Sequence, residues 1–199
     1  MKIVVVGATG TVGKAVVAAL QGRHEIIKVG SKSGDLQADI KDSKSIRALF
    51  EKTGKVDAVV CTAGKVHFGD FAKLTETEML SSLKDKFLGQ VNLVLIGRDY
   101  VNDNGSFTLM SGLLSHDPIR LGACASAVNG AVDAFVKCAA IELPRGLRIN
   151  SISPGLLEES LGHYGPYFPG HETVSGARVG RAYVKSVEGH LTGETFQVL

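Results

Sequence analysis

Several side chains in the middle of the chain could take part in proton transfer or nucleophilic attack. Ser111, Ser115 and His116 follow the apolar run FTLM, and Cys124 lies in the stretch GACASAVNGAVDAF at residues 122–135. Imidazole titrates near neutral pH, so His116 could act as an acid. A helix N-terminus would favour a thiolate at Cys124. The structural alternatives are an exposed loop histidine and a small core cysteine.

Lysine and tyrosine side chains elsewhere in the chain could bring a proton to the same place. Lys86 lies in a helical segment, where it could supply an ammonium or be a solvated helix lysine. Tyr164 and Tyr167 lie in the segment HYGPYFP, where either phenol could reach a site or pack within the loop. No spacing of His, Cys, Asp and Glu indicates a metal site, so we expect none.

A glycine-rich segment near the N-terminus predicts a phosphate-binding turn. It runs from Gly7 to Gly13 (GATGTVG), after the β-branched run Ile3–Val6 and at the start of a helical stripe over Thr11–Gln21. Glycines permit a tight turn and a close approach of the backbone to pyrophosphate, and the helix N-terminus offers free N–H groups. The residues expected to contact a dinucleotide here are Gly7, Thr9, Gly10, Thr11, Val12 and Gly13.

The end of the second predicted strand, Glu25–Val29, bears on which dinucleotide binds. Sites for NAD usually place Asp or Glu there, on the ribose diol. This sequence instead continues with glycine and then Ser31, Lys32 and Ser33, two hydroxyls and one cation that suit a 2′-phosphate. We therefore expect NADP as the cofactor. Asp35 could still reach the ribose, which leaves NAD open.

The elements that would position these residues alternate along the chain. Predicted strands cover Ile3–Val6, Glu25–Val29, Val56–Cys61, Ser106–Met110, Leu147–Ile152 and Thr195–Val198, and predicted helices cover Thr11–Gln21, Asp42–Thr53, Thr75–Asn102, Ala123–Leu143 and Val174–Glu188. This alternation predicts an α/β fold with a doubly wound parallel sheet, the Rossmann fold. Ligands of such sheets bind beyond the carboxyl ends of the strands. The length fits one NAD(P)-binding domain over residues 1–199.

Composition narrows the class of protein. The net charge is +2 and no basic block stands out, so we expect neither nucleic acid nor an anionic membrane as a partner. The apolar run near the N-terminus is too short for a membrane span or a signal-peptide core. The three cysteines form no C-x-x-C pair, which is typical of reduced thiols in a cytoplasmic protein.

In this order, the motifs resemble those of the short-chain dehydrogenase/reductase family. Gly7–Gly13 is similar to its N-terminal glycine motif, with the spacing G-x-x-G-x-x-G in place of the commoner G-x-x-x-G-x-G. The segment Arg148–Gly155 resembles the family's R-V-N-x-V-x-P-G strand, and Leu191–Thr195 resembles its closing T-G-x-x strand. The resemblance adds expected cofactor contacts at the adenine step (Asp39, Ile40), the loop CTAG (Cys61, Thr62, Ala63, Gly64) and the nicotinamide border (Pro154, Gly155).

The resemblance also implies a reaction, hydride transfer between nicotinamide and a carbonyl or alcohol. Family members use a tyrosine as proton donor with a lysine four residues later, and these positions fall on Ala125 and Asn129. The family's serine falls at Ser111 or Gly112, and its helix asparagine falls at Lys86, so the resemblance implies that Lys86 could place an ammonium near Ser111. An alkoxide formed by hydride reduction needs an acid beside it.

Two hypotheses follow. One is an NADP-dependent oxidoreductase with an atypical active site, in which Ser111, His116 and Lys86 are the expected catalytic residues and the substrate is a small carbonyl or alcohol. The other is an inactive NADP(H)-binding module with a sensing or partner-binding role. Small residues at 122–135 allow close helix packing, and the family commonly forms a dimer interface there and at Thr75–Asn102, so we expect a homodimer or homotetramer.

Overall fold

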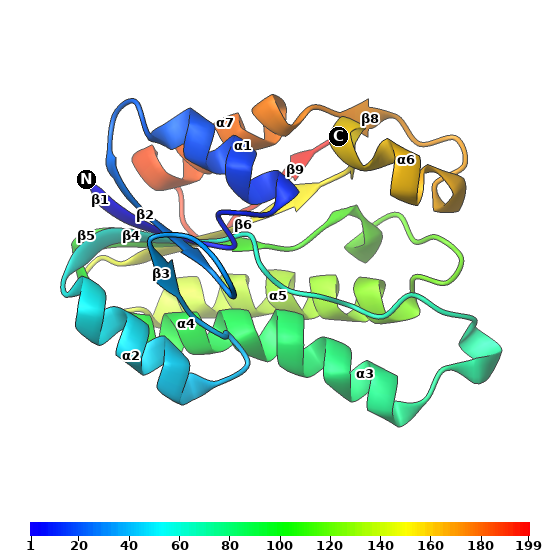
Figure 1. The fold of residues 1–199 in the computed structure, drawn as a ribbon, viewed down its shortest axis with the longest axis horizontal. Helices are drawn as coiled ribbons and strands as arrows, with labels where there is room; N and C mark the ends of the chain where they lie inside the picture. The colour runs from blue at the N-terminus through cyan, green and yellow to red at the C-terminus, as the bar shows by residue number, and fades with distance from the viewer.

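The computed structural model describes residues 1–199 and contains a seven-stranded parallel sheet between two layers of helices (Figure 1). The strand order is β3-β2-β1-β4-β5-β6-β9. The strands are β1 (Lys2–Val6), β2 (Glu25–Gly30), β3 (Leu36–Gln37), β4 (Val56–Cys61), β5 (Val101–Met110), β6 (Arg148–Pro154) and β9 (Thr195–Val198). The order reverses at β1, which pairs with β2 on one side and β4 on the other. The predicted doubly wound sheet is confirmed, and its switch point lies beyond the ends of β1 and β4.

Helices cover both faces of this sheet (Figure 1). One face carries α1 (Thr11–Leu20) and α7 (Gly176–Glu188), and the other carries α2 (Ser43–Thr53), α4 (Gly89–Gly97) and α5 (Ala123–Glu142). A separate cluster of buried apolar side chains fills each interface. The four residues Ile3–Val6 supply both clusters alternately, which explains why this strand is apolar throughout.

Local signals explain where the helices begin and end. The Asp42 carboxylate accepts a hydrogen bond from Lys44 N at 2.9 Å and caps α2. Gly54 ends the same helix with a φ of 62°. In α1, a Cβ on Gly13 would lie 2.0 Å from Gly7 O, so only glycine allows this helix to pack against the preceding turn.

Several predicted boundaries were wrong, because short or mixed segments carry no clear periodicity. The strand that was predicted to begin at Ser106 is β5, and it begins at Val101. The last helix begins at Gly176, because Thr173–Val174 form β8, which pairs with β7 (Leu156–Leu157) in a small second sheet. The segment predicted as helix over Thr75–Asn102 divides into α3 (Glu76–Ser82), a π-helical turn (Leu83–Leu88) and α4.

The helix α5 is long and apolar enough by composition to cross a membrane. In this structure it lies against β6, and it carries the buried polar side chains of Asn129 and Asp133. Such groups are costly in the hydrocarbon of a bilayer. The composition of α5 is therefore accounted for by packing onto the sheet.

Candidate functional site

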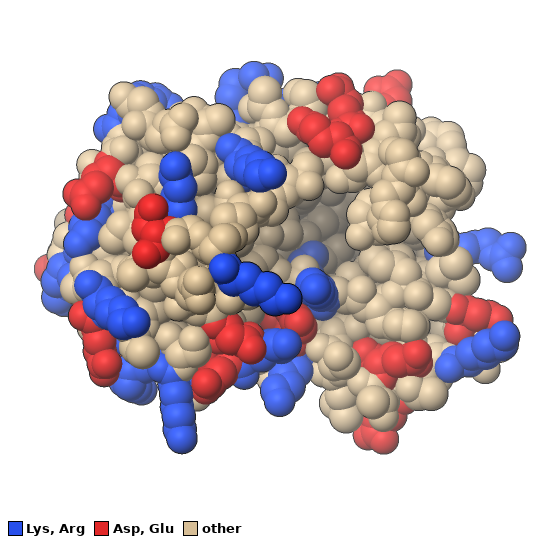
Figure 2. Space-filling model, viewed as in Figure 1, with Lys and Arg blue, Asp and Glu red and all other residues tan.

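A cleft of about 600 Å³ opens at the carboxyl ends of β1, β2 and β4. Its lining includes many residues expected to contact a dinucleotide: Gly7, Thr9, Gly10, Ser31, Lys32, Asp39, Ile40, Thr62, Ala63 and Gly64. It also includes Lys41 and Lys65, which the sequence analysis did not single out. Figure 2 shows a hollow on this face between α1 and α6, with Lys or Arg side chains at its lower edge.

The glycine turn brings the N-terminus of α1 to this cleft. Gly7 N and Ala8 N both donate to Val29 O, at 2.8 and 3.1 Å, which fixes the turn against β2. Gly7 has a φ of 86°, a conformation that favours glycine. No side chain caps the N-terminus of α1, where Gly10 is the N-cap residue. Its first N–H groups are therefore available to an anion such as phosphate.

The turn after β2 has the chemistry of a 2′-phosphate site. Ser31 and Lys32 are exposed and line the cleft. The Asp35 carboxylate, in contrast, accepts a hydrogen bond from Lys28 N at 2.8 Å and does not line the cleft. Asp35, the residue that left NAD possible as the cofactor, is thus hydrogen-bonded to β2. This geometry favours a cofactor with a phosphate on the ribose.

Four other expected cofactor residues line neither this cleft nor the second cavity described below. Thr11 begins α1 and is exposed, and Gly13 is buried beneath the turn. Ser33 is exposed in the turn after β2. Cys61 is fully buried at the end of β4, and burial raises the pKa of its thiol to about 12. The buried Cys61 side chain therefore packs beneath the loop that follows β4.

A second cavity of about 220 Å³ adjoins the ends of β5 and β6. It is lined by Val12, Val66, Phe68, Lys86, Met110, Ser111, Gly112, Leu113, Leu114, Ala125, Asn129, Pro154, Gly155, Leu156, Leu157, Ser160, Tyr164 and Phe168. The lining thus brings together Lys86 and Ser111 with the expected nicotinamide border, Pro154 and Gly155. Tyr164 also lines this cavity, whereas Tyr167 and His116 do not. The apolar residues of its walls come from segments that follow three different strands. No pattern in the sequence indicated that these residues line one cavity.

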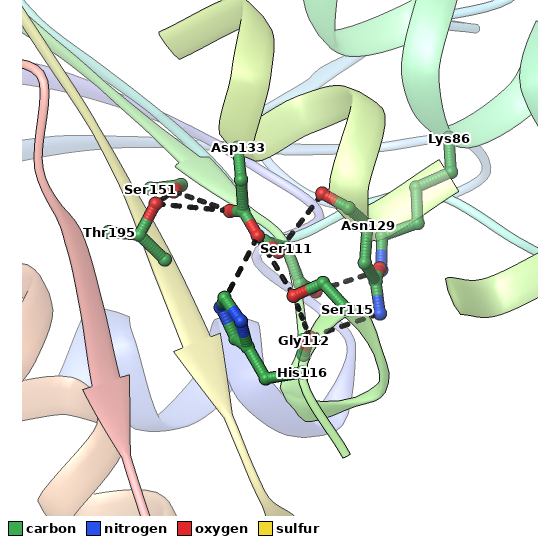
Figure 3. Close-up of polar contacts among 9 residues, drawn as sticks. All are labelled: Lys86, Ser111, Gly112, Ser115, His116, Asn129, Asp133, Ser151 and Thr195. Carbon is green, nitrogen blue, oxygen red and sulfur yellow. Dashed lines mark hydrogen bonds and ion pairs between the residues drawn. The ribbon is translucent and has the colours of Figure 1, made fainter. Parts of the chain in front are cut away.

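Lys86 is the only charged residue in this lining. It lies on the π-helical turn, is 7% exposed, and its Nζ donates to Asn129 Oδ1 at 2.6 Å and to Ser111 O at 2.9 Å (Figure 3). Burial lowers its pKa to about 8, while the charge of Asp133 and a smaller effect of Cys61 act in the opposite direction. The site therefore holds an amine that titrates close to neutral pH.

Ser111 and Asn129 hold this amine through their own contacts. Asn129 Nδ2 donates to Gly112 O at 3.2 Å, so its oxygen is left to face Lys86. Ser111 Oγ donates to the backbone oxygen of Asn129 at 3.3 Å. Ser111 thus contacts Lys86 through its carbonyl oxygen, while its hydroxyl bonds to α5. The sequence did not indicate this division of roles.

His116 lies apart from the cavity, beside a buried carboxylate. Its Nε2 is 3.8 Å from Asp133 Oδ2, and its side chain is about half exposed. Asp133 accepts hydrogen bonds from the hydroxyls of Ser115, Ser151 and Thr195 at 2.9 to 3.2 Å (Figure 3). This cluster joins α5 to β6 and β9. The position of His116 gives it no contact with the groups around Lys86.

Cys124 is not exposed as a nucleophile, and the acidic side chains form no metal site. Cys124 is 1% exposed, as the core alternative predicts. No group of three or more His, Cys, Asp and Glu side chains converges as a metal site.

Comparison with known protein families gives a match over residues 4–181 to the model described as enoyl-(acyl carrier protein) reductase. A short-chain dehydrogenase/reductase of Pestalotiopsis microspora is 28% identical over 138 residues, covering 66% of this chain and 52% of that protein. A versicolorin reductase of Emericella nidulans is 27% identical over 163 residues, covering 78% and 62%. The chain thus spans between half and two thirds of the length of these curated relatives.

Two solved structures resemble this one along the whole chain. The protein lin1944 from Listeria innocua has a TM-score of 0.99 and 48% identity, with all of both chains covered. A small-chain dehydrogenase in complex with NADPH has a TM-score of 0.88 and 27% identity, covering all of this chain and 96% of that one.

Proposed function

The chain belongs to the short-chain dehydrogenase/reductase family, and from this premise we propose that it binds NADPH and reduces a small carbonyl compound, with Lys86 as the proton donor. The observation that carries the proposal is the buried Lys86 amine, which lines the cavity beside the expected nicotinamide border. The relatives are named as reductases and dehydrogenases, which supports oxidoreductase chemistry.

The residues present fit NADPH as the cofactor. The glycine turn and the uncapped N-terminus of α1 suit the pyrophosphate, and Ser31 and Lys32 suit the 2′-phosphate. The related small-chain dehydrogenase was solved with NADPH. When bound, NADPH would supply a hydride to the carbonyl carbon.

Lys86 would supply the matching proton. An ammonium has three N–H donors, and Ser111 and Asn129 accept from two of them. The third remains for a carbonyl oxygen in the cavity. As the oxygen gains negative charge it takes a proton from Lys86, so the products are an alcohol and NADP⁺, and solvent later returns a proton to the amine. A pKa of about 8 keeps most of the amine protonated at neutral pH.

The second candidate function is an NADP(H)-binding module without turnover. It is favoured by one observation, that Ala125 and Asn129 occupy the positions where the family resemblance implies tyrosine and lysine. This alternative requires the cofactor cleft but gives Lys86 only a structural role. Cofactor binding alone does not separate the two functions.

The experiment follows the oxidation of NADPH with a set of aldehydes, ketones and quinones. The Lys86→Met variant should lose about 100-fold or more of kcat/KM while keeping its affinity for NADPH, because general acid catalysis is lost. Lys84→Met, at an exposed position of the same turn, is the matched control and should keep both. NADPH binding without any turnover would favour the second candidate, and full activity of Lys86→Met would reject Lys86 as donor.

A further inference from the structure

We propose that the cavity around Lys86 accepts a small, uncharged, apolar carbonyl compound, either a short aldehyde or ketone or one with a single aromatic ring. This inference rests on the proposed reduction and adds the class of substrate to it. Three features of the cavity support it: its volume, its walls and its charge.

The space beside Lys86 is small, although it opens to solvent on one side. The cavity measures about 220 Å³. Pockets for drug-sized ligands usually measure about 300 to 1,000 Å³, and this cavity corresponds to roughly seven waters of liquid volume. Val12, Pro154 and Gly155 also line it, so part of that space adjoins the expected nicotinamide position. The remainder fits one ring or a short chain.

The walls select an apolar body. Phe68 comes from the loop after β4, Leu114 from the segment after β5, and Leu157 and Phe168 from the chain after β6. Removing apolar surface from water is favourable in proportion to its area, so a hydrocarbon body gains affinity from these walls. A substrate with many hydroxyls would find few partners for them in this part of the cavity.

The charge of the cavity selects a neutral substrate. Lys86 is the only charged group in the lining, and two of its N–H donors already bond to Ser111 and Asn129. One remaining N–H can serve a carbonyl oxygen, whereas carboxylate recognition typically uses a bidentate arginine or several donors. A buried carboxylate with a single donor would be poorly compensated for its lost hydration.

Two contacts hold in place the residues that line the cavity from the loop after β4 and from the segment around α6. The rings of Phe68 and Tyr164 lie 6.0 Å apart between centroids and join the loop after β4 to α6 (Leu161–Tyr164). The Glu159 carboxylate accepts a hydrogen bond from Gly176 N at 2.9 Å, which ties the same segment to α7. Figure 1 shows this segment beyond the ends of the strands.

The first test compares substrates in pairs, with NADPH and the whole protein. Isoamyl methyl ketone and levulinate have the same shape but carry an isopropyl group and a carboxylate, respectively. Benzaldehyde and anthraldehyde share the aldehyde but differ in size. We expect kcat/KM to favour the neutral ketone and the single-ring aldehyde by about tenfold or more each. Preference for levulinate or anthraldehyde would overturn the inference and leave the proposed reduction intact.

A binding measurement separates failure of the reaction from failure of the substrate class. Benzamide and benzoate are probes of equal shape, and calorimetry in the presence of NADP⁺ compares them. If no carbonyl is reduced but benzamide binds and benzoate does not, the proposed reduction fails and the ligand class stands. If benzoate binds as well as benzamide, or neither binds and no small neutral carbonyl is reduced, the inference is wrong.

A variant tests whether these walls set the size limit. Phe168→Ala should raise kcat/KM for naphthaldehyde by about tenfold, because it removes a ring from the cavity wall. Tyr167→Ala is the control, since Tyr167 lies in the same segment but does not line the cavity. Equal rates for naphthaldehyde in both variants and the natural protein would show that Phe168 does not limit substrate size.

Discussion

The Lys86 amine connects pH to both activity and stability. Its pKa in the folded protein is about 8, against a usual value of 10.5. If Lys86 donates the proton, kcat/KM for reduction should be constant below about pH 8 and fall about tenfold per unit above it. A rate that stays constant to pH 10 would contradict this role.

The same shift makes a separate prediction about folding. Between about pH 8 and 10.5 the unfolded chain holds more protons on Lys86 than the folded chain does, so the stability contributed by this group rises with pH across that window. The full change is on the order of 3 kcal/mol. Denaturant unfolding at several pH values should show this rise in the natural protein and not in Lys86→Met. Identical pH slopes in both proteins would mean that the burial of Lys86 does not shift its pKa.

Gly64 controls the position of the Lys86 side chain. A Cβ on Gly64 would lie 2.6 Å from Lys86 Cγ, and the residue has a φ of 133°. Gly64→Ala should therefore destabilise the protein by about 1–3 kcal/mol and lower the rate of reduction, because Lys86 must move. Gly22→Ala meets nothing within 4 Å and should leave both unchanged. Denaturant unfolding and the NADPH oxidation rate measure the two effects.

At the scale of single residues, the sequence predicted which residues lie near each other better than it predicted which atoms form hydrogen bonds. Lys86 and Ser111 were expected near each other from the family resemblance, and they are bonded through the Ser111 carbonyl oxygen. His116 follows the same strand, but the turn Leu113–Ser115 places it against Asp133 and outside the cavity. The end of a strand indicates which residues are near a site, whereas the turn that follows decides where each side chain points.

At the scale of elements, Asp133 holds α5 onto the sheet. Its carboxylate accepts from Ser115, Ser151 and Thr195, which belong to three other segments. Asp133→Ala should cost about 3 kcal/mol or more of stability, because buried hydroxyls lose their acceptor. Asp133→Asn keeps one acceptor oxygen and should cost less. Lys137→Ala, at an exposed position of α5, is the control, and a loss in Asp133→Ala no larger than in this control would contradict the prediction.

The elements differ in how far their sequences predicted them. The strand Val56–Cys61 was predicted with its observed bounds, because a buried central strand is mostly apolar and here only Asp57 interrupts the apolar residues. The two-residue strands β3, β7 and β8 are too short to show any alternation. They depend on pairing with neighbours, which a single sequence does not reveal. The second cavity was missed for the same reason, since its wall includes β7.

At the scale of the whole molecule, exposed leucine and isoleucine side chains suggest an interface. Leu88 lies on the turn before α4, Leu95 on α4 and Ile141 on α5, and they are 45%, 47% and 87% exposed. We expect a homo-oligomer that buries this face, in keeping with the interface that the family resemblance implies. Leu95→Asp should reduce the mass measured by light scattering, whereas Leu191→Asp should not. A monomeric natural protein at micromolar concentration would contradict the expectation.

The doubly wound parallel sheet was predicted from the alternation of strands and helices, because right-handed crossovers leave few arrangements, whereas the order of its strands comes from the structure. The sequence alone did not decide between the cofactors, because the choice depends on where the side chains of Ser31, Lys32 and Asp35 lie relative to the cleft. The sequence offered both NADP and NAD. The Asp35 carboxylate, which an NAD site could use, instead accepts a hydrogen bond from Lys28 N and does not line the cleft.

Cofactor binding should therefore stabilise the whole molecule selectively. NADPH at about 100 times its Kd adds about 2.7 kcal/mol, which corresponds to a rise in Tm of roughly 5–10 °C for a chain of this length. NADH at the same concentration should raise Tm less.

Lys32→Ala should reduce the NADPH effect to about that of NADH and leave the NADH effect unchanged, because only the 2′-phosphate meets this side chain. Lys14→Ala, exposed on α1 and outside the cleft, should change neither. Equal shifts with both cofactors would mean that the turn after β2 does not select for phosphate, and no shift with either would remove the premise of cofactor-dependent reduction.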